Sequence, residues 1–212
     1  MNKRNLDLHG FVPDTADVAL LLIDVINDMD FPEADDLLKA ALPMAHKIKA
    51  LKKYCREQKI PAVYLNDNFG VWRSDFKTVL QHCLSAESKG REIVELLHPD
   101  DNDYFVLKPK HSGFFSTTLG VLLDHLQCHT LIVTGVAGNI CVLFTANDAY
   151  MRDFKLLVPS DCIASNTEEE NHHALMQMQK VLKADIATSE ELIQQGKLSP
   201  RSDVAQDPLE GS

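Results

Sequence analysis

Short, continuously apolar runs alternate with longer stretches of helical spacing along this chain. A continuous run, unlike one that alternates with polar residues, is typical of a strand covered on both faces of a parallel sheet. Such runs predict strands at 18–24, 61–66, 104–107, 129–134, 154–158 and 184–187. Helical spacing predicts helices at 34–57, 74–84, 92–97, 117–126, 139–152, 168–183 and 189–192. The alternation predicts an α/β fold: an open, mostly parallel six-stranded sheet with helices on both faces.

The length of 212 residues is enough for one domain with a full core. We expect an N-terminal arm over 1–15, a single folded domain over 16–196 and a flexible C-terminal tail over 197–212, where Ser, Pro, Asp and Gln become frequent. Thr167 and Glu170 have the spacing of a capping box, which predicts where the helix ending near 183 begins.

Charge and composition exclude several classes of partner. Hydrophobic residues make up 45% of the chain and charged residues 25%, the mix of an ordinary globular protein. The net charge of −10 would repel a phosphate backbone or an anionic membrane, so we expect neither nucleic acid nor membrane as a partner. No apolar run approaches the ~20 residues that span a bilayer. The first residues lack the apolar core of a signal peptide, so we expect a cytoplasmic location.

Cysteine usage argues against a disulfide framework or a zinc site. The five cysteines are widely spaced and odd in number, and none forms a C-x-x-C pair. They are Cys55, Cys83, Cys128, Cys141 and Cys162. Most of them are expected to be buried, inert thiols.

The residues that follow the predicted strands carry the candidate chemistry, because ligands of such sheets bind at the carboxyl ends of the strands. Asp24 ends the first run, Lys108 follows the third, and Cys141 lies beyond the fourth, at the start of a predicted helix. A helix start favours a thiolate, since free N–H groups and the positive dipole end stabilise the anion. Asp24 can take the thiol proton and Lys108 can favour the thiolate. Backbone N–H groups at Ala137 and Cys141 can bind an oxyanion.

Each of these residues also has an ordinary explanation. Asp24 can cap a turn, Lys108 can be a solvated surface residue, and Cys141 can be a packed thiol. Lys110 would share the strand face of Lys108, and His111 is interpreted as part of the loop that follows. The three candidates point to nucleophilic chemistry only as a set.

Three motifs extend the pattern beyond single residues. The chain reads ALLLIDVIND at 19–28, VLKPKHSGF at 106–114 and TGVAGNICVLFTANDA at 134–149. In this order they resemble the motifs of the isochorismatase-like cysteine hydrolases, and the resemblance covers about residues 16–190. It implies a Rossmann-like three-layer fold and a catalytic triad of Asp24, Lys108 and Cys141. It also implies a non-proline cis peptide between Val136 and Ala137 that shapes the oxyanion hole.

At two positions the chain differs from particular members of the family, and each difference limits the range of reactions that we expect. Nicotinamidases of this family bind a metal through an Asp-x-His element after the second strand, whereas this chain has Asn66-Asp67-Asn68 there, so we expect no metal and no cofactor. Members that cleave the vinyl ether of isochorismate can lack the cysteine. Retention of Cys141 therefore favours cleavage of a C–N bond (amide, carbamoyl or ureido) in a small metabolite through a thioester. The alternatives are a vinyl ether hydrolase and a catalytically silent member that only binds a metabolite.

Substrate selection is expected to depend on the loops around the site. Phe31, Asn68, Trp72 and Arg73 are candidate substrate-binding residues, and Arg73 could pair with a substrate carboxylate. The alternative is an ordinary loop with Trp72 packed at its edge. The resemblance also implies a homo-oligomer, a dimer or tetramer, in which neighbouring subunits shape the pocket.

Overall fold

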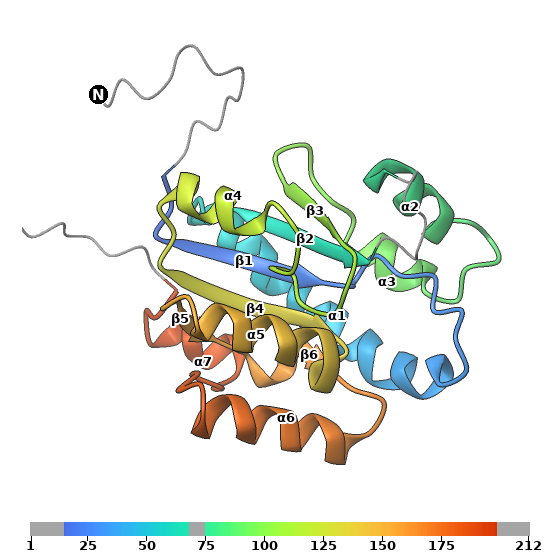
Figure 1. Ribbon diagram of the computed structural model, residues 1–212. Coiled ribbons are helices and arrows are strands. Elements are labelled where there is room, and N and C mark those ends of the chain that lie inside the picture. Colours follow the sequence, from blue (N-terminus) through green and yellow to red (C-terminus); the bar gives the residue numbers. More distant parts are fainter. Residues whose placement is uncertain (1–14, 68–74, 199–212) are drawn as a thin grey trace, which may run out of the picture.

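The computed structural model describes residues 15–67 and 75–198, and its centre is a six-stranded sheet (Figure 1). The strands are β1 (Val18–Ile23), β2 (Ala62–Asp67), β3 (Tyr104–Lys108), β4 (Thr130–Val136), β5 (Lys155–Leu157) and β6 (Ile163–Ala164). Their order is β3-β2-β1-β4-β5, with β6 paired to the end of β4, and all pairings among these strands are parallel. The predicted fold class is confirmed.

Helices cover both faces of the sheet. The α-helices are α1 (Ala34–Glu57), α2 (Phe76–Cys83), α3 (Arg91–Leu96), α4 (Leu119–Leu126), α5 (Leu143–Tyr150), α6 (Glu168–Lys180) and α7 (Ser189–Gln194). A π-helix, η1 (Gly138–Val142), precedes α5, and a 3₁₀-helix, η2 (Ser160–Cys162), precedes β6. None of the helices in the described ranges is both long and apolar enough to cross a membrane.

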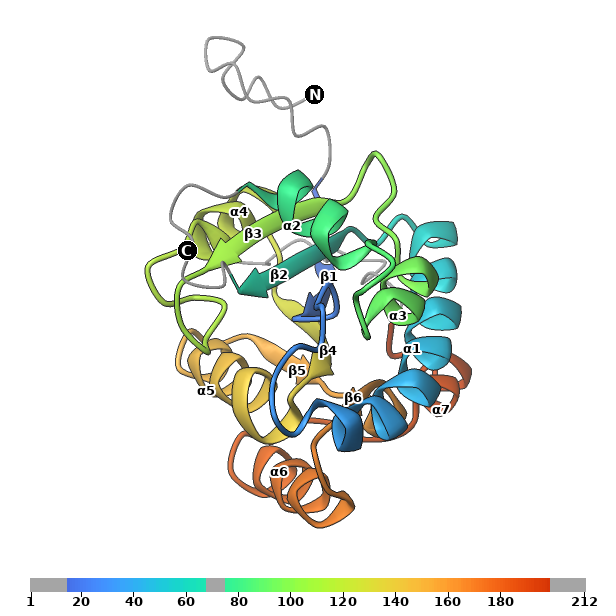
Figure 2. The same cartoon turned by 90° about the vertical axis from the view of Figure 1, so that its right-hand side faces the viewer.

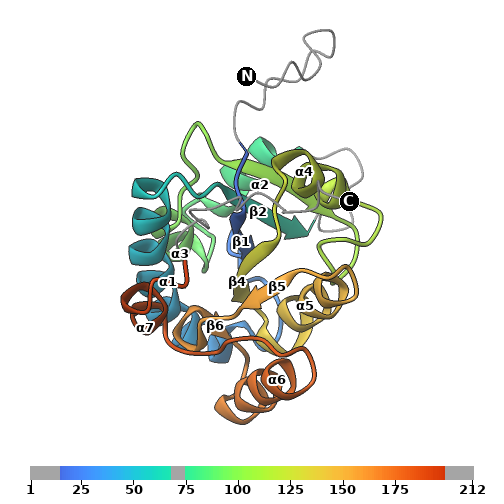
Figure 3. The same cartoon turned by 90° about the vertical axis from the view of Figure 1, so that its left-hand side faces the viewer.

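The continuous apolar run of β1 is explained by burial on two sides. Leu20 and Leu22 pack into a core cluster with α1, α2, α3 and α7, whereas Leu21 and Ile23 pack into a second cluster with α4, α5 and α6. All four side chains are fully buried. The end-on views show α1, α3 and α7 on one side of the sheet and α4 and α5 on the other (Figures 2 and 3). Each such leucine stabilises the fold by about 2 kcal/mol through removal of apolar surface from water.

One predicted strand is wrong. The sixth strand was expected at 184–187, but only Asp185 makes an isolated bridge there, to Leu157. The sixth strand is β6, because β4 extends beyond β5 and its last residues Gly135 and Val136 pair with the short segment after η2. The predicted helix at 139–152 is divided into η1 and α5.

The helix caps differ from the prediction in one respect. The Thr167 hydroxyl accepts a hydrogen bond from the Glu170 N–H at 3.2 Å and so caps α6. The full reciprocal capping box is found instead at Thr188 and Glu191, at the start of α7. The arm predicted over 1–15 and the tail over 197–212 fall almost wholly outside the described residues and stay predictions.

Candidate active site

Three strand ends bring a carboxylate, an ammonium group and a thiol together. Asp24 directly follows β1, Lys108 is the last residue of β3, and Cys141 lies in η1, just beyond β4. The strand order reverses between β1 and β4, which is where open α/β sheets bind their ligands. Lys108 Nζ lies 2.7 Å from Asp24 Oδ2 and donates to Cys141 Sγ at 3.5 Å.

The ion pair of Asp24 and Lys108 is buried, and both side chains make further hydrogen bonds. The Lys108 side chain is 0% exposed and that of Asp24 8%. Asp24 Oδ1 accepts the backbone N–H of Asp67 at 2.8 Å, and Lys108 Nζ also donates to the Lys110 carbonyl at 3.3 Å. Two charges taken out of water need such compensation, because a buried charge without a partner costs several kcal/mol.

Local backbone geometry explains why β1 and β4 approach so closely. Gly135 has a φ of +114°, and a Cβ at this position would lie 2.0 Å from the Ile23 carbonyl oxygen. Only glycine fits there. Asp24, which follows Ile23, has a φ of 50°, in the left-handed region that Asp tolerates better than most residues. The carboxylate therefore turns off the end of β1 beside the segment that leads to Cys141.

The turn between β4 and α5 has an unusual backbone. The peptide bond between Val136 and Ala137 is cis, at the position that the family resemblance implied. The Ala137 carbonyl accepts the N–H groups of Ile140 at 3.0 Å and Val142 at 3.2 Å, which closes η1. Ala137 and Cys141, the residues predicted to supply oxyanion donors, thus lie in one tight turn.

The electrostatics of the site correct one expectation. A helix start was expected to favour a Cys141 thiolate, but burial and the nearby Asp24 carboxylate raise the pKa of Cys141 to about 12, and Lys108 only partly offsets this. Burial also raises the pKa of Asp24 despite the attraction of Lys108. Burial opposes the charge of Lys108, yet the pKa of Lys108 is raised because Asp24 attracts the ammonium group. The resting site therefore holds a thiol beside a carboxylate that binds protons more readily than usual.

His111 lies closer to Cys141 than the sequence indicated. Its Nδ1 is 3.7 Å from Cys141 Sγ, and its ring is tilted against that of Phe144, with 5.5 Å between the centroids. The sequence offered one signal, since His111 is only three residues beyond Lys108. A loop that turned back at once would bring it to the same site.

The other candidate residues occupy different surroundings. Phe31 is half-buried and packs against the core cluster beside α1. Asn68, Trp72 and Arg73 lie outside the described residues. Asn66, at the first position of the segment that corresponds to the nicotinamidase metal element, is 1% exposed and donates to the Ile26 carbonyl at 2.7 Å. It thus holds the loop after β1.

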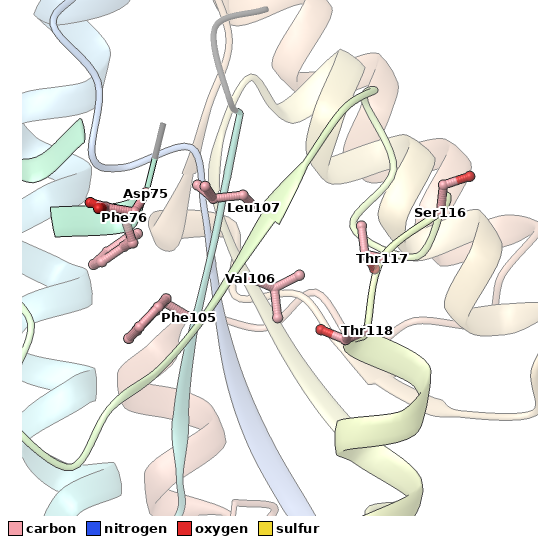
Figure 4. A pocket seen from close by; sticks show the side chains of 8 residues that line it. All are labelled: Asp75, Phe76, Phe105, Val106, Leu107, Ser116, Thr117 and Thr118. Carbon is pink, nitrogen blue, oxygen red and sulfur yellow. The ribbon is translucent and has the colours of Figure 1, made fainter. Parts of the chain in front are cut away.

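No group of three or more His, Cys, Asp or Glu side chains in 15–67 and 75–198 is arranged to hold a metal ion. A hollow of about 420 Å³ lies elsewhere, along the outer edge of the sheet beside β3 (Figure 4). It is lined by Asp75, Phe76, Phe105, Val106, Leu107, Ser116, Thr117 and Thr118. The triad residues do not line this hollow, so it is not the site of the candidate chemistry.

Comparison with known proteins decides the family. Residues 18–191 match the family model of the isochorismatase domain. The chain belongs to the isochorismatase family. The uncharacterized isochorismatase family protein YaaI of Bacillus subtilis (strain 168) is 46% identical over 179 residues, which cover 84% of this chain and 98% of YaaI. This supports a hydrolase with the fold of that family.

Two further similar proteins are informative. The ureidoacrylate amidohydrolase RutB of Methylorubrum extorquens is 38% identical over 81 residues, which are 38% of this chain and 33% of RutB. The crystal structure of an isochorismatase-like hydrolase from Alkaliphilus metalliredigens superposes with a TM-score of 0.67 at 27% identity and covers 85% of this chain and 99% of that one. The three-layer fold is therefore shared with a solved hydrolase of the family.

Proposed function

We propose that this isochorismatase-family protein is a cysteine hydrolase that cleaves a C–N bond of a small metabolite through a thioester on Cys141. Its location would be the cytoplasm. The observation that carries the proposal is the contact of Cys141 Sγ with Lys108 Nζ at 3.5 Å, in a site where that ammonium group is 2.7 Å from Asp24. A nucleophile, a base and a cation within mutual reach are what acyl transfer needs.

Acylation begins with proton transfer from the Cys141 thiol to Asp24. The raised pKa of Asp24 favours this transfer, and Lys108 stabilises the thiolate that it produces. The thiolate attacks the substrate carbonyl, and the carbonyl π electrons move to oxygen. Backbone N–H groups at Ala137 and Cys141 bind this oxyanion. The C–N bond then breaks, and protonated Asp24 gives its proton to the leaving amine.

Deacylation returns the enzyme to its starting state. Water attacks the thioester carbonyl after a base removes one of its protons, and Asp24 is a base within the triad that can do so. The C–S bond breaks, the product leaves as an acid or carbamate, and the proton returns to Cys141. The cycle consumes one water and needs neither metal nor cofactor.

An amide, carbamoyl or ureido substrate is favoured over an ether. Cleavage of a vinyl ether needs protonation and water but no acyl-enzyme, so Cys141 would have no role in it. The partial similarity to the ureidoacrylate amidohydrolase RutB also supports C–N chemistry. The second candidate, an isochorismatase-type ether hydrolase, is favoured by the family to which the chain belongs.

A substrate panel tests the proposal. The wild-type protein and Cys141→Ala would be assayed on small primary amides, N-carbamoyl compounds, ureido acids and isochorismate. We expect turnover in one of the C–N classes, with a loss of about 10³-fold or more in Cys141→Ala because no other group can form the thioester. The matched control is Cys128→Ser, which replaces a different cysteine and should leave the turnover unchanged. Cys128 Sγ donates to the Thr130 carbonyl at 3.2 Å.

Each contrary result identifies a different alternative. Turnover of a C–N substrate that is unchanged in Cys141→Ala would contradict the thioester mechanism. Consumption of isochorismate that survives this substitution would support the ether hydrolase. Absence of turnover, together with a Cys141 that no acylating reagent modifies, would support the silent metabolite-binding member.

A further inference from the structure

One titratable side chain at the nucleophile has no role in the proposed cycle. His111 Nδ1 lies 3.7 Å from Cys141 Sγ, within hydrogen-bond range for sulfur, and the His111 side chain is exposed. Asp24 and Lys108, the other neighbours of the sulfur, are buried. The sulfur therefore has an inner side with the ion pair and an outer, solvent-facing side with an imidazole.

The loop that carries His111 is tied to the catalytic elements on both sides. Before it, the Lys110 carbonyl accepts from Lys108 Nζ at 3.3 Å. After it, the Gly113 N–H donates to Thr145 Oγ1 at 3.0 Å, and that hydroxyl donates to the Cys141 carbonyl at 2.7 Å. The imidazole is thus positioned relative to the nucleophile by bonds to Lys108 and to the Cys141 backbone itself.

Two further contacts fix this arrangement to α5. The Ser112 hydroxyl donates to the Asp148 carboxylate, and the same hydroxyl accepts the Phe114 N–H at 3.1 Å. The ring of Phe144, one turn before Asp148, lies against the imidazole with an interplanar angle of 51°. An exposed histidine held in this way is preorganised, which a general base requires.

We propose that His111 is the general base of deacylation, an inference that rests on the proposed thioester mechanism. Neutral His111 takes a proton at Nδ1 from the attacking water as the hydroxide oxygen bonds to the thioester carbon. When the tetrahedral intermediate collapses, the C–S bond breaks and its electron pair goes to sulfur. The imidazolium then returns the proton to Cys141 Sγ, which its Nδ1 already contacts. His111 thus replaces Asp24 as the base of deacylation, and Asp24 keeps its role in acylation.

The position of the two bases explains this division. Asp24 lies on the inner side of the sulfur, and its side chain is only 8% exposed. The hydrolytic water enters from solvent, which is the side of His111. An imidazole is also the side chain suited to gain and lose a proton near neutral pH.

Other ionisable side chains lie near the imidazole. Among the described residues they include Cys141 on η1, Lys108 and Lys110 on the segment of His111 itself and, behind the sulfur, Asp24. To take a proton from water, the imidazole must be neutral.

The test uses p-nitrophenyl acetate, an activated ester that acetylates a competent nucleophile and needs no knowledge of the natural substrate. Nitrophenolate release gives a burst for acylation and a slower steady state for deacylation. In His111→Gln we expect an unchanged burst, a steady state slower by about 10²-fold and accumulation of acetyl-Cys141 by mass spectrometry. The matched control, His125→Gln, removes an exposed histidine of α4 and leaves both phases unchanged.

A second variant separates catalysis from positioning. Asn in His111→Asn keeps an N–H donor but no base, so we expect the same slow deacylation. A wild-type rate of deacylation in His111→Asn, or an unchanged steady state in His111→Gln, would overturn the role of His111. Either result would leave the thioester mechanism intact. If the wild-type protein acquires no acetyl group on Cys141, the thioester mechanism fails, and the His111 role fails with it.

Discussion

At the scale of single residues, Cys141 differs from a structural thiol in its neighbours. Burial raises the pKa of Cys55 and of Cys141 alike to about 12. Cys55 is packed in the apolar core, whereas Cys141 is half-buried and has an ammonium donor at 3.5 Å and a carboxylate beside it. In the proposed mechanism, reactivity therefore depends on a proton transfer within the site and not on a permanently ionised thiol.

Asp24→Asn tests that proton transfer. Asparagine still accepts the Asp67 N–H but cannot take the thiol proton, so we expect the acylation burst with p-nitrophenyl acetate to slow by at least about 10²-fold. The substitution also leaves Lys108 buried without its counter-charge, which lowers the free energy of unfolding by about 3 kcal/mol. Stopped-flow nitrophenolate release and urea denaturation measure the two effects. A burst of wild-type rate in a folded Asp24→Asn protein would contradict the assigned base.

The pH profile of acylation offers a second test of the same carboxyl. Asp24 acts as a base only when ionised, and burial raises its pKa above the ordinary 3.8. Acylation therefore falls as the pH drops through this raised value, and its acid limb lies above pH 3.8. The acid limb of the pH profile should move to higher pH in Lys108→Met. This substitution removes the attracting ammonium group, so the pKa of Asp24 rises further. An acid limb below the ordinary carboxyl range would contradict this assignment.

The sequence predicted these residues to different degrees. Asp24, Lys108 and Cys141 could be found because each lies at or just beyond the end of a strand, and parallel strands bring their carboxyl ends to one edge. The proximity of His111 could not, because it depends on hydrogen bonds from Gly113 and Lys108 that turn the loop back over the sulfur. The protonation state of Cys141 also depends on burial, which one helix position does not reveal.

At the scale of secondary-structure elements, the close approach of β1 and β4 determines the site. Gly135→Ala would place a Cβ 2.0 Å from the Ile23 carbonyl and force the φ of +114° on a residue that rarely adopts it. We expect a loss of at least about 3 kcal/mol in the free energy of unfolding, measured by urea denaturation. Gly120→Ala, on α4 with open space around it, is the control and should stabilise by up to about 1 kcal/mol. Equal stabilities would contradict this account of the strand packing.

The hydroxyl of Thr145 joins the His111 loop to the backbone of Cys141. Thr145→Val keeps the shape but leaves the Gly113 N–H without its acceptor in a buried position, so we expect a cost of about 1–3 kcal/mol. Deacylation should slow as well, because His111 loses its anchor. Thr145→Ser retains the hydroxyl and should preserve the rate. If Val and Ser variants deacylate equally fast, the hydroxyl does not position the loop.

The elements show where pattern analysis succeeds and where it fails. The bounds of α1 are the predicted 34–57, because its apolar stripe is long and regular. The sixth strand was misplaced because β6 has only two residues, Ile163 and Ala164, too few for a periodic signal. It pairs only because β4 extends past β5, a feature of the assembled sheet.

At the scale of the whole molecule, exposed apolar residues on η1 and α5 suit the predicted homo-oligomer. Ile140 on η1, Phe144 on α5 and Met151, which directly follows α5, are 37%, 53% and 70% exposed. We expect Met151→Lys to lower the molar mass measured by light scattering during gel filtration, because a charge is costly in a buried apolar contact. Val121→Lys, at a residue of α4 that is 73% exposed, is the control and should leave the mass unchanged. A wild-type monomer would contradict the predicted oligomer.

The central claim is that catalysis passes through a thioester on Cys141. Rapid acid quench of the wild-type enzyme during turnover of the C–N substrate identified by the panel, followed by peptide mass spectrometry, tests it most directly. We expect an added acyl or carbamoyl mass on the peptide that contains Cys141, more abundant in His111→Gln. Turnover without such an adduct, at a rate that Cys141→Ala preserves, would contradict it.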